Sequence, residues 1–135
     1  MQCFIIMKFK YTILYVEDVK KTIEFYKEAF GFELKFITPE EDYAEIETGE
    51  TTLCFACYSV AKFNEIKMSK SSISEISLPF ELTFVTNNIQ DDFQRAVNSG
   101  AKIIKQPLQK PWGQIVGYVQ DINGFLIEIC TPVEE

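Results

Sequence analysis

Two stretches of the chain place apolar residues at the spacing of an amphipathic helix. The first apolar stripe consists of Val19, Ile23, Phe25, Tyr26 and Phe30, and the second of Ile89, Phe93, Ala96 and Val97. Asp18 and Asn88 stand at the expected N-caps, because their side chains can accept from free backbone amides. Gly31 and Gly100 stand where the helices should end, since glycine adopts the left-handed conformation that closes a helix.

Each predicted helix is followed by three segments that alternate as strands do. These segments are Glu33–Ile37, Tyr43–Thr48 and Thr52–Tyr58, and then Lys102–Gln106, Gln114–Gln120 and Phe125–Cys130. One further strand precedes each helix, in YTILYV and in ELTFV. The order βαβββ therefore occurs twice, about 70 residues apart, which is typical of an internal duplication. Another α+β arrangement of two helices and eight strands is the alternative.

The duplication predicts one domain over residues 1–135, built from two modules at residues 7–60 and 79–133. A chain of 135 residues is long enough for one core. Residues 61–78, rich in Ser and Lys, form the predicted linker, which we expect to be mobile. Met7 is an alternative start to Met1, and the sequence leaves this choice open.

The segment DINGFLIEIC places a carboxylate inside an apolar strand. Asn123-Gly124 is a turn signal, and the residues after it alternate between two faces. One face carries Phe125, Ile127 and Ile129, and the other carries Leu126, Glu128 and Cys130. Glu128 is therefore a candidate for a functional position.

Charge excludes some classes of partner. The net charge is −7, which argues against nucleic acid, because phosphate binding needs a basic patch. Arg95 is the only arginine, which disfavours a site that holds an anion with two parallel hydrogen bonds. The acidity indicates either simple solubility or a preference for neutral or cationic ligands. No apolar run approaches the roughly 20 residues of a membrane helix, so no membrane partner is expected.

The four cysteines do not form a recognisable site. Cys54 and Cys57 have CxxC spacing, but residues three apart on a strand face opposite ways. With Cys3 and Cys130 there is no second CxxC, so neither a metal site nor a redox pair is predicted. Without a secretory signal, we expect a cytoplasmic protein with reduced thiols.

The chain resembles the vicinal oxygen chelate superfamily, which includes glyoxalase I, bleomycin-resistance proteins, fosfomycin-resistance enzymes and extradiol dioxygenases. The resemblance rests on YTILYVEDVKKTIEFYKEAFGFEL, ELTFVTNN and GAKIIKQPLQKPWGQIVGYVQDINGFLIEI, and covers Phe9 to Pro132. It implies an α+β fold in which two βαβββ modules form a cup-shaped mixed sheet with the site on its concave face. It also implies a homodimer, with modules paired within or between chains.

Four positions of the chain correspond to the metal ligands of that superfamily. They are Tyr11, Cys54, Glu81 and Glu128. Only Glu128 keeps the residue type found in metal-using members. We expect the four side chains to meet at the centre of the cup.

The composition disfavours a catalytic metal, so we expect no cofactor. The chain has no histidine, and imidazole is the usual protein ligand of Zn, Fe, Ni and Cu. If a divalent metal binds, its ligands would be Glu81, Glu128 and Tyr11. Without a metal, the two carboxylates should repel each other, which raises the pKa of one of them. The pair could then serve as general acid and base, or it could hold a cationic group of a ligand. The structural alternative places Glu81 in solvent at the rim and Glu128 against Tyr11.

Strand parity extends the predicted wall of the cup. The further wall residues are Ile13, Tyr15, Thr52, Ala56, Tyr58, Thr83, Val85, Gln114, Val116 and Tyr118. Trp112 either packs over the mouth or offers a stacking surface. The predicted ligand-binding residues are Tyr11, Cys54, Tyr58, Trp112, Gln114 and Tyr118.

Three functions remain open from the sequence. The first is binding of a small cationic or aromatic molecule without a catalytic metal, similar to the bleomycin-resistance branch. The second is a glyoxalase-like lyase or isomerase that uses a divalent metal or the pair Glu81 and Glu128 as catalytic residues. The third is a structural or regulatory module with a filled cup. The sequence decides neither the ligand nor whether a reaction occurs.

Overall fold

The computed structural model describes residues 6–133, which form two modules of the same build. The first comprises β1 (Tyr11–Val16), α1 (Val19–Phe30), β2 (Glu33–Ile37), β3 (Tyr43–Glu47) and β4 (Thr52–Cys57). The second comprises β5 (Glu81–Val85), α3 (Ile89–Asn98), β6 (Lys102–Gln109), β7 (Ile115–Gln120) and β8 (Leu126–Cys130). The predicted α+β class and the repeated βαβββ order are confirmed. The expectations for Met1 and Cys3 lie outside the described residues.

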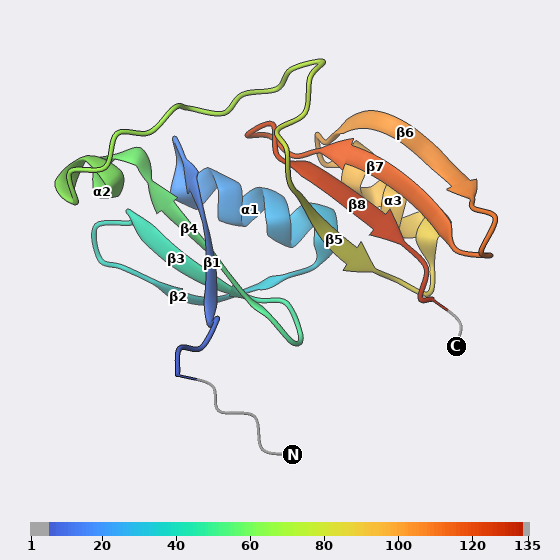
Figure 1. The fold of residues 1–135 in the computed structure, drawn as a ribbon, viewed down its shortest axis with the longest axis horizontal. Coiled ribbons are helices and arrows are strands. Elements are labelled where there is room, and N and C mark those ends of the chain that lie inside the picture. The colour runs from blue at the N-terminus through green and yellow to red at the C-terminus, as the bar shows by residue number, and fades with distance from the viewer. Residues whose placement is uncertain (1–5, 134–135) are drawn as a thin grey trace.

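The strands form two four-stranded sheets with identical internal order. The first sheet runs β1-β4-β3-β2 and the second β5-β8-β7-β6. In each, the first strand pairs in parallel with the last, and the other pairs are antiparallel. The sheets are separate and lie side by side, with β1 and β5 as their neighbouring edges (Figure 1). None of the helices that the described part contains is long and apolar enough to cross a membrane.

Local sequence signals set most of the element ends. The Asp18 side chain accepts from the backbone N–H of Lys21 at 3.0 Å, and Gly31 closes α1 with φ of 77°. The second helix ends differently from the prediction: Ser99 caps α3 in a right-handed conformation, and Gly100 follows it with φ of 115°. Asn88 is the N-cap residue, but its side chain bonds Asp91 rather than a backbone amide.

The end of the first module corrects one prediction. Strand β4 stops at Cys57, and Tyr58 begins a short helix, α2 (Tyr58–Phe63), instead of ending the strand. The Tyr58 hydroxyl accepts from the backbone N–H of Ser71 at 3.0 Å. Tyr58 therefore contacts the linker and is not part of the strand's open face.

The linker is tied to the second module by an amide side chain. Buried Gln120 accepts from the backbone N–H of Ser74 and donates to its carbonyl, at 3.2 and 2.8 Å. This pairing copies the bonds that a neighbouring strand would make. The backbone at Ser72 also lies directly over Gly124 in the β7–β8 turn. The linker thus follows a defined path over that turn.

The two modules are joined through their helices. Helix α1 packs against α3, and the Tyr26 hydroxyl donates to the Asp121 carboxylate of the second module at 2.5 Å. Asp121 is fully buried and also accepts from the backbone N–H groups of Asn123 and Phe125, both at 2.9 Å. Burial raises the pKa of Asp121 and, together with the carboxylate, that of Tyr26.

The joint between the modules, which is the contact of α1 with α3 and with Asp121, also includes the single arginine. From α3, Arg95 donates to the carbonyl of Glu28 at 2.7 Å and to that of Lys27 at 3.3 Å. These carbonyls lie at the C-terminal end of α1, where a positive charge also complements the helix dipole. Arg95 therefore stabilises the joint.

Replacing Gly124 with Ala should destabilise the fold, because the added Cβ would collide with the Ser72 carbonyl. Gly49→Ala is a matched control, since Gly49 also has positive φ (105°) but nothing lies within 4 Å of its added Cβ. We expect Gly49→Ala to lower the free energy of unfolding by about 1 kcal/mol, because of backbone strain. Gly124→Ala should lower it by roughly 2 kcal/mol more, as measured by urea unfolding. Equal losses would show that the linker does not pack on the turn.

Asp121→Asn should gain stability relative to the unmodified protein as pH rises. The raised pKa means that folded Asp121 holds its proton where the unfolded chain has lost it, so ionisation disfavours folding above the ordinary value near 4. Asparagine keeps the shape without this titration. Urea unfolding from pH 4 to 8 measures the difference. A difference independent of pH would contradict the prediction.

Candidate functional site

The first sheet carries a phenol–carboxylate pair on the face turned away from α1. The Tyr43 hydroxyl donates to Glu45 at 2.8 Å and lies 3.2 Å from the Cys54 sulfur. Glu45 and Cys54 are directly opposite each other in the β3–β4 register. Burial and these two neighbours raise the pKa of Tyr43 above its ordinary range, and burial raises that of Cys54. The phenol and the thiol therefore stay protonated while the carboxylate accepts.

The second sheet carries a similar pair on its open face. The Tyr118 hydroxyl donates to Glu128 at 2.9 Å, and these residues are opposite each other in the β7–β8 register. Burial, the bond to Glu128 and the charge of Glu81 raise the pKa of Tyr118 to about 12. Burial and Glu128 likewise raise the pKa of Cys130 to about 11. Glu81 and Glu128 thus act on the same small group of side chains.

The two pairs occupy related positions in the duplicated fold. Cys54 faces Ile13 across the parallel β1–β4 pairing, and Glu128 faces Thr83 across the parallel β5–β8 pairing. Glu45, the partner of Cys54, corresponds in the same way to Tyr118, the partner of Glu128. Each open face therefore presents one carboxylate held by a tyrosine, within β3 in the first sheet and between β7 and β8 in the second.

Within one chain the four predicted central residues fall into two groups. Tyr11 and Cys54 lie on the first sheet, and Glu81 and Glu128 on the second. The predicted pairing of Glu128 with Tyr11 is replaced by its bond to Tyr118. Helices α1 and α3 join the modules through the helical sides of the sheets, so a shared centre of all four residues stays a prediction that concerns modules paired between chains.

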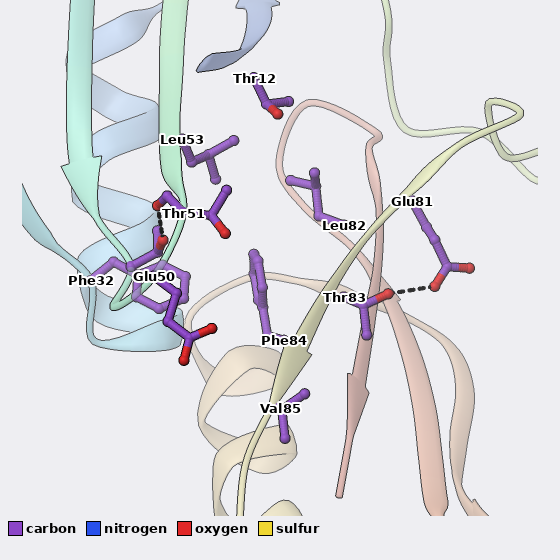
Figure 2. A pocket seen from close by; sticks show the side chains of 11 residues that line it. Thr12, Phe32, Glu50, Thr51, Leu53, Glu81, Leu82, Thr83, Phe84 and Val85 are labelled. Carbon is purple, nitrogen blue, oxygen red and sulfur yellow. Dashed lines mark hydrogen bonds between the residues drawn. The ribbon is translucent and has the colours of Figure 1, made fainter. Parts of the chain in front are cut away.

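A cavity of about 700 Å³ lies between the modules, beside the unpaired edge of β5 (Figure 2). It is lined by apolar side chains, among them Phe32, Leu53 and Phe84, and by threonine hydroxyls. Of the four central residues only Glu81 reaches its rim, and Figure 2 shows that carboxylate directed away from the cavity and bonded to Thr83. This cavity separates the modules and does not contain the phenol–carboxylate pairs.

The other predicted ligand-binding residues lie at three places. Tyr11 is 46% exposed on the open face of the first sheet, whereas Cys54 is fully buried there. Tyr58 lines a small cavity of about 190 Å³ with the linker. Trp112 stands in the β6–β7 turn, where its indole N–H donates to Gln114 at 2.8 Å.

Within a single chain, the donor set does not fit a divalent metal. The fully buried Cys54 thiol has a raised pKa, although a thiol must lose its proton to bind a metal. Tyr11 lies on the other sheet from the two carboxylates. Between residues 6 and 133, no three His, Cys, Asp or Glu side chains are grouped as a metal ion requires. We therefore derive no chemistry through a metal.

Tyr43 and Glu45 were not among the site residues predicted from the sequence. Strand alternation placed both on one face of the predicted strand Tyr43–Thr48, which was the available signal. Their contact with Cys54 depends on the register between β3 and β4. That register is set by the hairpin turn between Glu47 and Thr52, and strand alternation alone does not give the geometry of this turn.

Comparisons with known proteins agree with this architecture. A model of the glyoxalase-like domain matches residues 9–134. An uncharacterised Bacillus subtilis protein, YraH, is 28% identical over 124 residues, covering 91% of this chain and 97% of that protein.

Solved structures share the fold at low sequence identity. A glyoxalase/bleomycin resistance protein/dioxygenase family enzyme from Burkholderia phytofirmans superposes with a TM-score of 0.79 at 19% identity, covering 93% of this chain and 98% of that one. A glyoxalase-related enzyme from Fulvimarina pelagi gives 0.77 at 18% identity, covering 94% and 89%. The match over nearly the whole chain, together with the doubled βαβββ architecture, places this protein in the glyoxalase-like domain family of the vicinal oxygen chelate superfamily.

Proposed function

We propose that the protein binds a small organic cation with an aromatic or apolar body, without a catalytic metal. The observation that carries this proposal is the tyrosine–carboxylate pair on each open face, Tyr43 with Glu45 and Tyr118 with Glu128. Each phenol holds the carboxylate that it contacts in one position. A fixed negative charge beside aromatic rings attracts a cation through charge and through the ring faces.

A homodimer would bring the two kinds of pair together. The helical sides of the sheets are used inside the chain, while the open faces expose apolar side chains such as Phe36 (49%) and Tyr11 (46%). If the first sheet of one copy faces the second sheet of the other, these side chains are covered and two equivalent cups result. Each cup then holds Glu45 from one copy and Glu128 from its partner.

A second function is favoured by one specific observation. Glu81 and Glu128 lie on the same face, and both raise the pKa of Tyr118 and of Cys130. Such a group could transfer a proton on a bound substrate, as a glyoxalase-like lyase or isomerase requires. Turnover of a hemithioacetal that Glu81→Gln and Glu128→Gln both abolish would favour this function over binding alone.

Glu45→Gln and Glu128→Gln should each weaken binding of a planar aromatic cation such as acridine orange. Each change removes the charge and leaves the tyrosine bond, so we expect roughly a 10-fold rise in Kd for each. Titration calorimetry measures the Kd, with a neutral aromatic of equal ring size as a probe that should bind weakly.

Glu24→Gln is the matched control, because it removes the same charge from the exposed side of α1. It should leave the Kd within about twofold, because solvent and salt screen an exposed charge. Equal weakening by all three changes would show that only net charge attracts the dye. The absence of binding at micromolar concentrations would remove the proposal.

Mixing the two single variants should restore half of the binding sites. In a dimer of Glu45→Gln with Glu128→Gln, one cup carries both changes and the other carries neither. Mixed dimers isolated with two different affinity tags should therefore bind one dye molecule per dimer with unmodified affinity. If each cup formed within a single chain, every cup would carry one change and no high-affinity site would return.

A further inference from the structure

A separate cavity of about 570 Å³ lies at the end of the second sheet. Three segments build it: the residues after β5, the β6–β7 turn and the residues after β8. Its wall includes Asn87, Gln109, Trp112, Gln114, Thr131 and Pro132. Every residue of this lining is uncharged, in contrast to the carboxylates of the open faces. The cavity therefore suits a ligand of different chemistry from the proposed cation.

The indole of Trp112 is held in position before any ligand arrives. Its N–H donates to the Gln114 carbonyl oxygen at 2.8 Å, and the Gln114 amide donates to the Thr131 backbone carbonyl at 2.8 Å. Gly113, with φ of 97°, closes the turn by donating to the carbonyl of Lys110. Trp112 is nevertheless 65% exposed. A surface fixed in this way loses little conformational entropy on binding.

The polar groups around the indole match hydroxyl groups. Asn87 and Gln109 carry exposed side-chain amides, and an amide both donates and accepts hydrogen bonds. Sugar hydroxyls also do both, and a pyranose ring has a flat C–H face that can lie on an indole. A charged ligand would find no opposite charge in this lining.

We propose that this cavity binds a neutral saccharide, stacked on Trp112 and hydrogen-bonded by Asn87 and Gln109. The site goes beyond the cation site of the open faces and does not require it. The two adjoin each other, because Gln114 also contacts Cys130 beside Glu128. A ligand with a cationic part and a glycosyl part could occupy both, but saccharide binding stands without that combination.

Trp112 supplies the readout, because it is the only tryptophan of the chain. Cellobiose added to the intact protein should shift its emission to shorter wavelength, saturate at millimolar concentrations and protect it from quenching by acrylamide. Glycerol, which lacks a flat ring face, should cause neither effect at equal concentration. Emission that acrylamide cannot quench without sugar would mean that the cavity is closed in the assembled protein, and would overturn the proposal.

Two amide variants and a control test the hydrogen bonds. Asn87→Ala and Gln109→Ala should each raise the Kd for cellobiose about fivefold. Gln90→Ala, which removes an exposed amide from α3, should leave the Kd unchanged. The proposal fails if cellobiose gives no saturable change up to about 100 mM, or if the amide variants bind it normally. Tighter binding of a neutral aromatic amide than of cellobiose would assign the cavity to planar aromatic compounds instead.

Discussion

The buried contact between α1 and the β7–β8 turn is the interaction on which the rest of the structure depends. The Asp121 carboxylate accepts the Tyr26 hydroxyl and two backbone N–H groups of its own turn. Asn123 in the same turn donates to Thr22 of α1 at 3.0 Å. One carboxylate thus shapes the turn and holds the other module. Because buried polar groups must find partners, this network fixes how the modules are oriented.

That orientation decides which surfaces can bind a ligand. The joint buries the helical sides of both sheets. It also engages the side chain of the single arginine, which extends from α3 to the end of α1. The open faces are left with tyrosines and carboxylates in a chain of net charge −7. The neutral cavity at Trp112 adjoins one of these faces. Acidic and uncharged surfaces therefore lie close together on the second module.

The sequence predicted the features that depend on neighbours along the chain. Alternation placed Phe125, Ile127 and Ile129 on one face of their strand, and all three are buried. The Asp18 cap and the Gly31 helix end are likewise local and were predicted correctly. The contact of Tyr43 with Cys54 depends on the turn that sets the β3–β4 register, which alternation does not describe. The joint depends on residues far apart in the chain, as in the bond of Tyr26 to Asp121, so local patterns could not reveal it. The resemblance supplied four site positions, two in each module, but not the packing of α1 against α3 that joins the modules.

The joint also has a consequence for biosynthesis. The Tyr26–Asp121 bond spans 95 residues and the Thr22–Asn123 bond spans 101. During translation, α1 leaves the ribosome long before the turn that completes its polar contacts. Such non-local pairings slow folding and leave apolar surface exposed in the interval. The nascent first module would therefore need protection from aggregation until almost the whole chain has emerged.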